Sequence, residues 1–190
     1  IGFHVAKALL NSHNKVIIID NFNDYYDPKL KEDRIRTIAN HQNLKIYRAD
    51  FSDKDAMLKI FKENKVDKLC HLGAQAGVRY SLENPYVYNK SNNLGTIVLL
   101  ELAKELGIKD FIYASSSSVY GGNTKTPFSE ADIVNRPISL YAATKLFTEL
   151  IAYVYHHLYG INCTGLRFFT VYGPFGRPDM AAFKFADKML

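Results

Sequence analysis

Short apolar runs alternate along the chain with longer stretches in which apolar residues recur every third or fourth position. The short runs are rich in β-branched residues and predict strands at 15–20, 44–49, 68–72, 110–114 and 163–168. The longer stretches predict helices at about 3–12, 28–41, 53–64, 84–107 and 138–159. This alternation is typical of an α/β fold, a Rossmann-type doubly wound parallel sheet whose strands are mostly buried on both faces.

Capping signals accompany two of these helices. Ser52 is expected to cap the third, with Asp55 three positions on, and Gly107 is expected to end the fourth.

The two ends of the chain lie inside predicted elements. The first residues enter a helix at once, although a sheet of this kind has a strand before its first helix. In the common order 3-2-1-4-5-6 that strand is central, and without it the flanking strands lack a partner. We therefore expect the natural protein to begin upstream, and the helix that opens at Pro178 to continue past Leu190. We interpret 1–168 as a dinucleotide-binding domain, without its first strand and most of its glycine-rich loop, and 169–190 as the start of a smaller substrate-binding region.

Composition narrows the classes of function. The 190 residues are 47% hydrophobic, enough for a continuous core. The net charge of +5 comes from basic residues scattered among acidic ones, so we expect no nucleic-acid partner. This mild positive charge is compatible with an anionic small ligand. Cys70 and Cys163 lack metal or disulfide spacing, and we interpret them as reduced thiols of a cytoplasmic protein with no metal site. No apolar run approaches the roughly 18 residues of a membrane span, so this segment is not expected to contact a membrane.

An acidic residue at a strand end indicates a cofactor. Asp20 follows an apolar run, 18 positions after Gly2, which fits a carboxylate that binds the ribose 2′-hydroxyl of NAD. Asn21 and its neighbours include no arginine for a 2′-phosphate, which disfavours NADP. For Asp20, the alternative is an aspartate in a turn that binds no ligand. Gly2 fits the last glycine of a phosphate-binding turn.

Further cofactor contacts are expected at the ends of the next two runs. Asp50, followed by Phe51, is placed to meet the adenine amino group, although a solvated turn residue explains it nearly as well. Leu72, Ala74 and Gln75 lie in a stretch of small residues where a flat ligand can approach the backbone. Tight packing is the alternative for that stretch.

Tyr141 and Lys145 are the residues most suited to chemistry. At positions i and i+4 they project from one face of a predicted helix, and a nearby cation favours the phenolate form of a tyrosine. The spacing alone is weak, because an amphipathic helix with a solvated lysine shows it too. The serine run 115–118 ends a strand, where parallel sheets bind ligands. A hydroxyl, a phenolate and an ammonium suit the joint transfer of a proton and a hydride.

Three segments together resemble the extended short-chain dehydrogenase/reductase family, and the resemblance covers essentially the whole chain. They are 114–121, 141–145 and 166–174, in the order and at the spacing of that family. The resemblance implies that Tyr141 is the acid/base, that Lys145 binds the nicotinamide ribose and lowers the pKa of the tyrosine, and that Ser116 orients the substrate hydroxyl. Ser117 and Ser118 remain alternatives to Ser116. Asn92 matches the asparagine that braces the cofactor region, or else it holds a helix start.

The resemblance also separates members of the family. Sugar-nucleotide dehydratases of this pattern carry Asp-Glu at the positions of Ser117 and Ser118, and related decarboxylases usually keep a glutamate at the second. Elimination of water needs that additional acid and base. Epimerisation needs only reversible oxidation at one carbon, so a single acid/base suffices.

The segment 173–181 resembles that of UDP-glucuronate 4-epimerases, which implies that Arg177 faces the sugar carboxylate or the nucleotide phosphates, with Thr170 beside it. A guanidinium makes bidentate contacts with a carboxylate. Arg79 is a further candidate for charge near the sugar or pyrophosphate. For each arginine a surface ion pair is the alternative.

The expected reaction interconverts UDP-glucuronate and UDP-galacturonate by transient oxidation at C4 with bound NAD. An epimerase of a neutral UDP-hexose or UDP-N-acetylhexosamine is the close alternative, and a non-catalytic NAD-binding sensor is the alternative of another class. Relatives dimerise through the helices near 84–107 and 138–159, which implies a homodimer. Tyr153, Tyr155 and Tyr159 belong either to that interface or to the core of one subunit.

Overall fold

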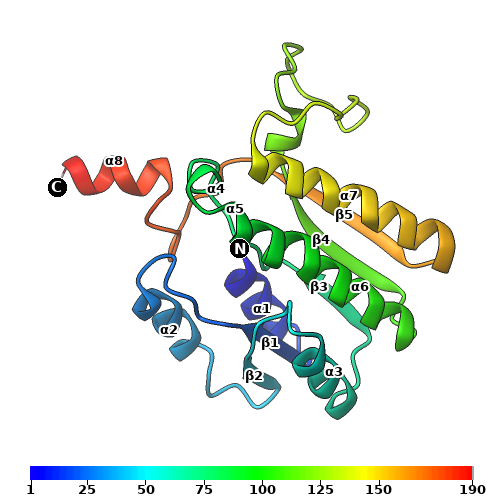
Figure 1. The fold of residues 1–190 in the computed structure, drawn as a ribbon. Coiled ribbons are helices and arrows are strands. Elements are labelled where there is room, and N and C mark those ends of the chain that lie inside the picture. Colours follow the sequence, from blue (N-terminus) through cyan, green and yellow to red (C-terminus); the bar gives the residue numbers. More distant parts are fainter. Residues whose placement is uncertain (190) are drawn as a thin grey trace. The chain divides into compact units, whose positions relative to one another are not determined.

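The computed structural model describes residues 1–189, which form two compact units. One unit contains residues 1–50 and the described residues from 170 onward, and the other contains residues 51–169. In each unit helices accompany parallel strands (Figure 1), so the predicted α/β class is confirmed. The boundary expected after residue 168 stays a prediction.

The first unit has a two-stranded parallel sheet. Its elements are α1 (Gly2–Asn11), β1 (Val16–Asp20), α2 (Pro28–Arg36), β2 (Leu44–Arg48) and α8 (Ala181–Met189). β1 pairs with β2, with Ile18 opposite Ile46. Ala6 and Leu10 lie on one face of α1 because they are four residues apart, and they form a small buried cluster with Ile38.

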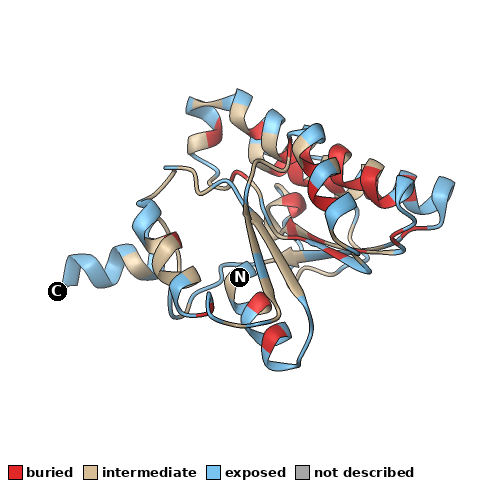
Figure 2. Ribbon diagram, turned by 90° about the horizontal axis from the view of Figure 1, so that it is seen from below, coloured by how far each residue is buried: buried red, intermediate tan, exposed pale blue. Residues whose placement is uncertain are grey.

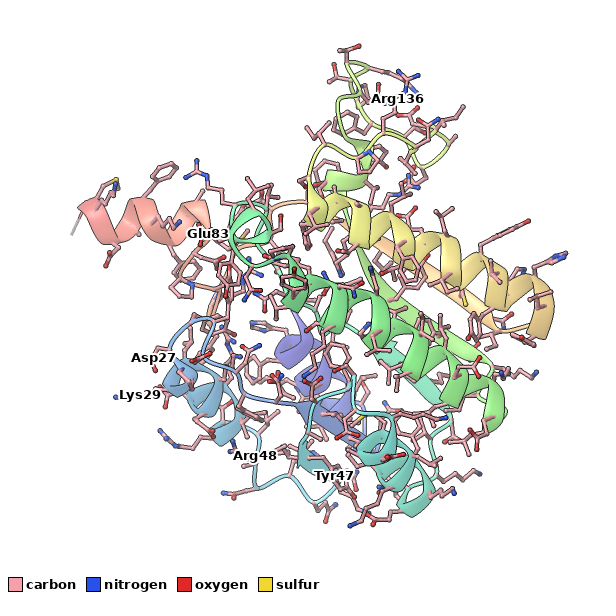
Figure 3. All side chains as sticks on the ribbon, in the orientation of Figure 1. Asp27, Lys29, Tyr47, Arg48, Glu83 and Arg136 are labelled. Atoms are coloured by element: carbon pink, nitrogen blue, oxygen red, sulfur yellow. The ribbon has the colours of Figure 1, made fainter. Side chains whose placement is uncertain are left out.

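The start of α2 follows from its sequence. The carboxylate of Asp27 accepts a hydrogen bond from the backbone N–H of Lys29 at 2.8 Å, and Pro28 occupies the first helical position, where a missing N–H costs nothing (Figure 3). The helix was expected to reach residue 41 but ends at Arg36.

The second unit has a three-stranded parallel sheet in the order β3-β4-β5. Its strands are β3 (Lys68–His71), β4 (Asp110–Ser116) and β5 (Asn162–Phe168). Its helices are α3 (Lys54–Glu63), α4 (Tyr80–Glu83), α5 (Pro85–Tyr88), the π-helix η1 (Asn89–Leu94), α6 (Gly95–Glu105), the 3₁₀ turn η2 (Ser117–Tyr120) and α7 (Leu140–Tyr159). α6 and α7 lie side by side along the sheet (Figure 1), and both carry several buried residues (Figure 2).

The long helix α7 has capping residues at both ends. The Ser139 side chain accepts a hydrogen bond from the backbone N–H of Ala142, and Gly160 ends the helix in the left-handed conformation, with φ 65°. The loop before α7 depends on Gly121, because a Cβ there would collide with the carbonyl of Arg136 (Figure 3).

Three sequence expectations about this unit are wrong in detail. The helix expected at 84–107 is divided into α5, η1 and α6, because Pro85 cannot continue a helix from α4 and η1 then changes the hydrogen-bond register. Asp53, not Ser52, caps α3, since its carboxylate accepts from the backbone N–H groups of Asp55 and Ala56. The expected end of α6 at Gly107, with φ 70°, agrees with the structure.

The third wrong expectation concerns the burial of the strands. Buried positions alternate with exposed ones in β3 and with half-buried ones in β4, and β5 is exposed or half-buried throughout. A strand buried on both faces needs cover on both faces. Among the described residues, α6 and α7 cover one face of this sheet.

Candidate active site

The first two turns of α7 carry the two residues most suited to chemistry. Lys145 is only 5% exposed, and its Nζ donates to the carbonyl oxygen of Ala114, 2.9 Å away near the end of β4. Burial lowers the pKa of Lys145 to about 8. The side chain is therefore protonated at neutral pH but poorly solvated, and such an ammonium stabilises an anion beside it more strongly than a solvated one does.

Tyr141 is half-buried and is oriented by residues of α4 and α5. Its ring meets the ring of Tyr88 edge-on, with centroids 6.2 Å apart. Its backbone N–H donates to the hydroxyl of Ser81 at 3.4 Å. Tyr88 in turn donates to the carbonyls of Ala76 and Gly77 at 2.8 and 2.5 Å. The position of Tyr141 thus depends on residues 76–88.

A buried chain of hydrogen bonds connects β3 to the catalytic helix. His71 Nε2 lies 3.2 Å from the hydroxyl of Thr96, which donates to the carbonyl of Asn92 at 2.5 Å. Asn92 Nδ2 donates to the hydroxyl of Thr144 at 2.9 Å, and Thr144 donates to the carbonyl of Tyr141 at 2.8 Å. Because Thr96 uses its proton on Asn92, the ring of His71 is the donor in their contact.

The protonation state of His71 agrees with that direction. Complete burial, with the charge of Lys145 as a second cause, lowers the pKa of His71 to about 3, so its imidazole is neutral. The sequence did not single out His71, Thr96 or Thr144 for this role. The one sequence feature that marks these three residues is that each is a polar residue within a predicted strand or helix.

Asn92 also binds the segment after β3, where cofactor contacts were expected. Its Oδ1 accepts from the backbone N–H of Gln75 at 2.8 Å, and its Nδ2 donates to the carbonyl of Gln75 at 3.0 Å. Leu72 and Ala74 are half-buried beside it. Phe51 packs close to the backbone of Gly73 and Gly95 and edge-on to the ring of His71, which supports the tight-packing interpretation of this stretch.

The serine run lies at the end of β4, as expected, and its members differ in their contacts. Ser115 is buried and donates to Glu149 at 2.5 Å. Ser116 Oγ accepts from the hydroxyl of Ser118 at 2.8 Å and from its backbone N–H at 3.2 Å. Ser117 is half-buried in the 3₁₀ turn η2. A hydroxyl that accepts hydrogen bonds becomes a better donor, so Ser116 suits a role toward a substrate oxygen.

Glu149 joins this serine run to β5. It receives a bidentate contact from Arg167, whose Nε and Nη2 lie 2.9 and 2.8 Å from the carboxylate oxygens. Both side chains are less than a fifth exposed. Arg167 also lies over the ring of Tyr120, and these contacts were missed at the sequence level because they join distant positions.

In the first unit, the carboxylate of Asp20 is exposed at the end of β1. Its Oδ1 accepts from the backbone N–H of Phe22 at 2.7 Å, a residue held at φ 50°. Asn21 is exposed, Gly2 is the first residue of α1, and Asp50 is half-buried. A carboxylate fixed at a strand end but open to solvent suits the hydroxyl pair of a ribose.

The three expected substrate residues outside the serine run differ in environment. Arg177 forms a bidentate pair with Asp179, with Nε–Oδ1 and Nη2–Oδ2 distances of 3.0 and 3.1 Å. Thr170 and Arg79 are exposed. Within the second unit the structure brings Ser116, Tyr141 and Lys145 to neighbouring elements; Arg177 and Thr170 belong to the first unit with Asp20.

Residues 1–189 show no sign of a metal site or a membrane span. No three His, Cys, Asp or Glu side chains gather there as a metal ion would require. No helix in that range has the length and apolar character to cross a membrane. Two surface hollows, one beside Lys7 and Arg36 and one beside Tyr113 and Glu149, are lined by residues other than Ser116, Tyr141 and Lys145.

Comparison with known proteins gives consistent matches. A family model described as GDP-mannose 4,6 dehydratase matches residues 1–189. An uncharacterized protein of Methanocaldococcus jannaschii is 57% identical over 192 residues, which cover 100% of this chain and 59% of that protein. UDP-glucuronate 4-epimerase 4 of Arabidopsis thaliana is 51% identical over 191 residues, covering 100% of this chain and 44% of the relative.

The solved structures give the same picture. The structure of UDP-glucuronic acid 4-epimerase from Bacillus cereus in complex with UDP-glucuronic acid and NAD has a TM-score of 0.91 and 36% identity, and the match covers 100% of this chain and 59% of that one. This chain therefore spans less than two thirds of the length of each of these proteins.

Proposed function

Since this chain belongs to the GDP-mannose 4,6 dehydratase family of extended short-chain dehydrogenases/reductases, we propose that it is the cofactor-binding part of an NAD-dependent nucleotide-sugar 4-epimerase that acts on UDP-glucuronate. The observation that carries this proposal is the buried ammonium of Lys145 in one helix turn with Tyr141, beside serines at 117 and 118. The family includes dehydratases, but two serines supply neither the extra acid nor the extra base of a dehydration.

The reaction assigns one role to each residue. Tyr141, as phenolate, takes the proton of the C4 hydroxyl and later returns a proton to the C4 oxygen. The hydroxyl of Ser116 holds that oxygen, and the charge of Lys145 stabilises the phenolate. NAD, when bound, accepts the hydride from C4 and gives it back to the opposite face, so the reaction has no net redox change.

Residues of the first unit fit NAD rather than NADP. Asp20 offers a carboxylate to a ribose 2′-hydroxyl and would repel a 2′-phosphate. Arg48, opposite Asp20 in the sheet register, is already engaged: it makes two contacts with Glu32 at 2.7 and 2.8 Å and lies 4.1 Å from the ring centroid of Phe22 (Figure 3). These contacts direct the guanidinium of Arg48 toward Glu32 and Phe22.

One observation favours the alternative of a neutral UDP-hexose. Asp179 already neutralises the charge of Arg177 through a bidentate contact, and a neutral sugar would not need a free guanidinium. We retain the uronate as the proposed substrate, because the relatives named for UDP-glucuronate match the whole chain, segment 173–181 included.

The proposal is tested by incubating the full-length protein with UDP-glucuronate without added NAD. Formation of UDP-galacturonate, followed by nuclear magnetic resonance, is the expected result. If product forms only after NAD is added, with one NAD consumed for each product, the protein is a dehydrogenase instead. The variant Arg177→Ala should lower kcat/KM for the uronate about 100-fold, given the usual energies of charged hydrogen bonds. Arg36→Ala is the matched control, since Arg36 pairs with Asp33 at the surface.

We further propose a cytoplasmic homodimer. α7 supports this assembly because it exposes Leu150, Tyr153 and Leu158, by 61%, 67% and 60%. Tyr155 does not support a role in the interface, since it is buried and donates a hydrogen bond to Glu101 on α6. Tyr159 is 41% exposed and so is accessible to a partner. Two free cysteines support a reducing compartment.

A further inference from the structure

The segment that carries Arg177 is held by side chains from three other parts of the first unit. The Nε2 atom of His4, on α1, lies 2.9 Å from the carbonyl oxygen of Pro174. Arg34 of α2 donates to the carbonyl of Phe175 from both Nε and Nη2, at 3.0 and 2.7 Å. Tyr25, in the loop after β1, donates to Asp179 Oδ2 at 3.3 Å. Residues 173–179 are called the Arg177 segment below.

The conformation of this segment needs such support. Phe175 has φ 57°, a left-handed conformation that costs energy for a residue with a side chain. Its carbonyl is the group that receives both hydrogen bonds from Arg34. Arg34 is in turn fixed by Tyr26, whose hydroxyl accepts from Nη1 at 2.5 Å and whose ring lies 5.3 Å from the guanidinium carbon. A strained residue with so many constraints indicates a segment whose geometry matters.

The same contacts determine which edge of Arg177 faces outward. A guanidinium offers two edges to a carboxylate, the Nε/Nη2 edge and the Nη1/Nη2 edge. Asp179 occupies the first, and Met180 Sδ lies 3.3 Å from Nη2. Among the described residues, no hydrogen-bond partner of Nη1 is seen. Asp179 thus orients Arg177 and leaves Nη1 for another acceptor.

We propose that Tyr25 and Arg34 are positioning residues for Arg177 and thereby set the preference of the site for an anionic sugar. Tyr25 acts through Asp179, and Arg34 acts through the carbonyl of Phe175. The inference rests on the proposed function, because it assigns Nη1 of Arg177 to the carboxylate of the uronate. It explains how an arginine that already has an acidic partner still selects a carboxylate.

The experiment compares two ligands that differ at one carbon. The dissociation constants of UDP-glucuronate and UDP-glucose are measured calorimetrically on the full-length, NAD-loaded protein in a Tyr141→Phe background, which prevents turnover. The readout is the ratio of the two constants. Loss of general structure would weaken both ligands together, whereas loss of carboxylate recognition changes the ratio.

Tyr25→Phe and Arg34→Lys are each expected to lower the preference for UDP-glucuronate about three- to tenfold, with UDP-glucose binding unchanged. Arg34→Lys keeps the positive charge and removes only the paired N–H donors of the guanidinium. A lower preference for UDP-glucuronate in this variant therefore cannot be a general effect of charge. Tyr86→Phe is the control, because Tyr86 is 84% exposed in the other unit.

Two outcomes separate failure of this inference from failure of the proposed function. If Arg177→Ala abolishes the preference but Tyr25→Phe and Arg34→Lys leave it intact, the positioning role is wrong and the uronate assignment stands. If Arg177→Ala leaves the preference intact, the uronate assignment of Arg177 is wrong, and the positioning role falls with it.

Discussion

Lys145 shows how one residue can be unfavourable for stability and suited to function. An ammonium in water would be protonated up to a pH near 10.5, but burial brings the pKa of Lys145 to about 8. The difference corresponds to about 3 kcal/mol of unfavourable free energy for the charged form in the folded state. One hydrogen bond, to Ala114, offsets part of it. A packing role alone would be filled better by an apolar residue of the same size.

The variant Lys145→Met should therefore be more stable than the parent and inactive. At pH 7 we expect a gain of about 1 to 2 kcal/mol in the free energy of unfolding, since the lost hydrogen bond offsets part of the relief. The cost of the lysine is fully present below pH 8, where the folded state keeps the buried charge. It fades between pH 8 and 10.5, because the folded protein then releases the proton before the unfolded chain does.

Urea unfolding of the full-length protein across that pH range measures the effect. The advantage of the methionine variant should shrink as the pH rises from 8 to 10.5. A constant advantage, or a less stable variant at pH 7, would contradict the prediction. Lys59→Met on α3 serves as the control, since Lys59 is exposed and its replacement should be nearly neutral at every pH.

At the scale of elements, the π-helix η1 is the link between β3 and α7. Asn92, at its centre, binds Gln75 on one side and Thr144 on the other, and every polar group in that chain of contacts has a partner. A π-turn widens the helix by one residue and is often found where a side chain must reach a functional site. Here it brings an amide to the hydroxyl of Thr144 on the catalytic helix.

Removing the hydroxyl of Thr144 should break that link. Thr144→Val deprives Asn92 of an acceptor and the carbonyl of Tyr141 of a donor, so we expect a loss of about 2 kcal/mol in stability. A slight shift of Tyr141 should also lower kcat about tenfold. Thr144→Ser should restore both. Thr148→Val is the matched control, because Thr148 bonds only to the carbonyl of Thr144; an equal fall in kcat there would contradict the link.

What the sequence could predict at this scale depends on the range of the interaction involved. The five strands and α7 were predicted because an apolar run such as Val16–Asp20, or the 3.6-residue period of a helix, acts over a few neighbouring residues. The break before α6 was missed, since η1 is polar from Asn89 to Asn93 and no apolar pattern there marks the change of hydrogen-bond register. Burial of β5 was overestimated because cover comes from distant parts of a chain.

The candidate site shows the same division. The spacing of Tyr141 and Lys145, and the place of Asp20 at a strand end, are local features, and they were read from the sequence. The pairing of Arg177 with Asp179 is also local, at two positions' separation, and an ion pair was the alternative that the sequence left open for Arg177. Contacts such as Arg34 with Phe175 span 141 positions and leave no local pattern.

At the scale of the whole molecule, the exposed apolar face of α7 is the main feature that the described residues leave uncovered. Specific dimers bury about 800 Å² on each partner, and Leu150, Tyr153 and Leu158 are exposed along one long helix.

If two copies pack through this face of α7, Leu150→Glu should place an unpaired charge in the interface and convert the dimer to a monomer. Analytical ultracentrifugation of the full-length protein measures this. Ile133→Glu, at an equally exposed apolar residue outside the helices, should remain a dimer. A monomeric parent, or a Leu150→Glu variant that still sediments as a dimer, would mean that another part of the chain covers this face.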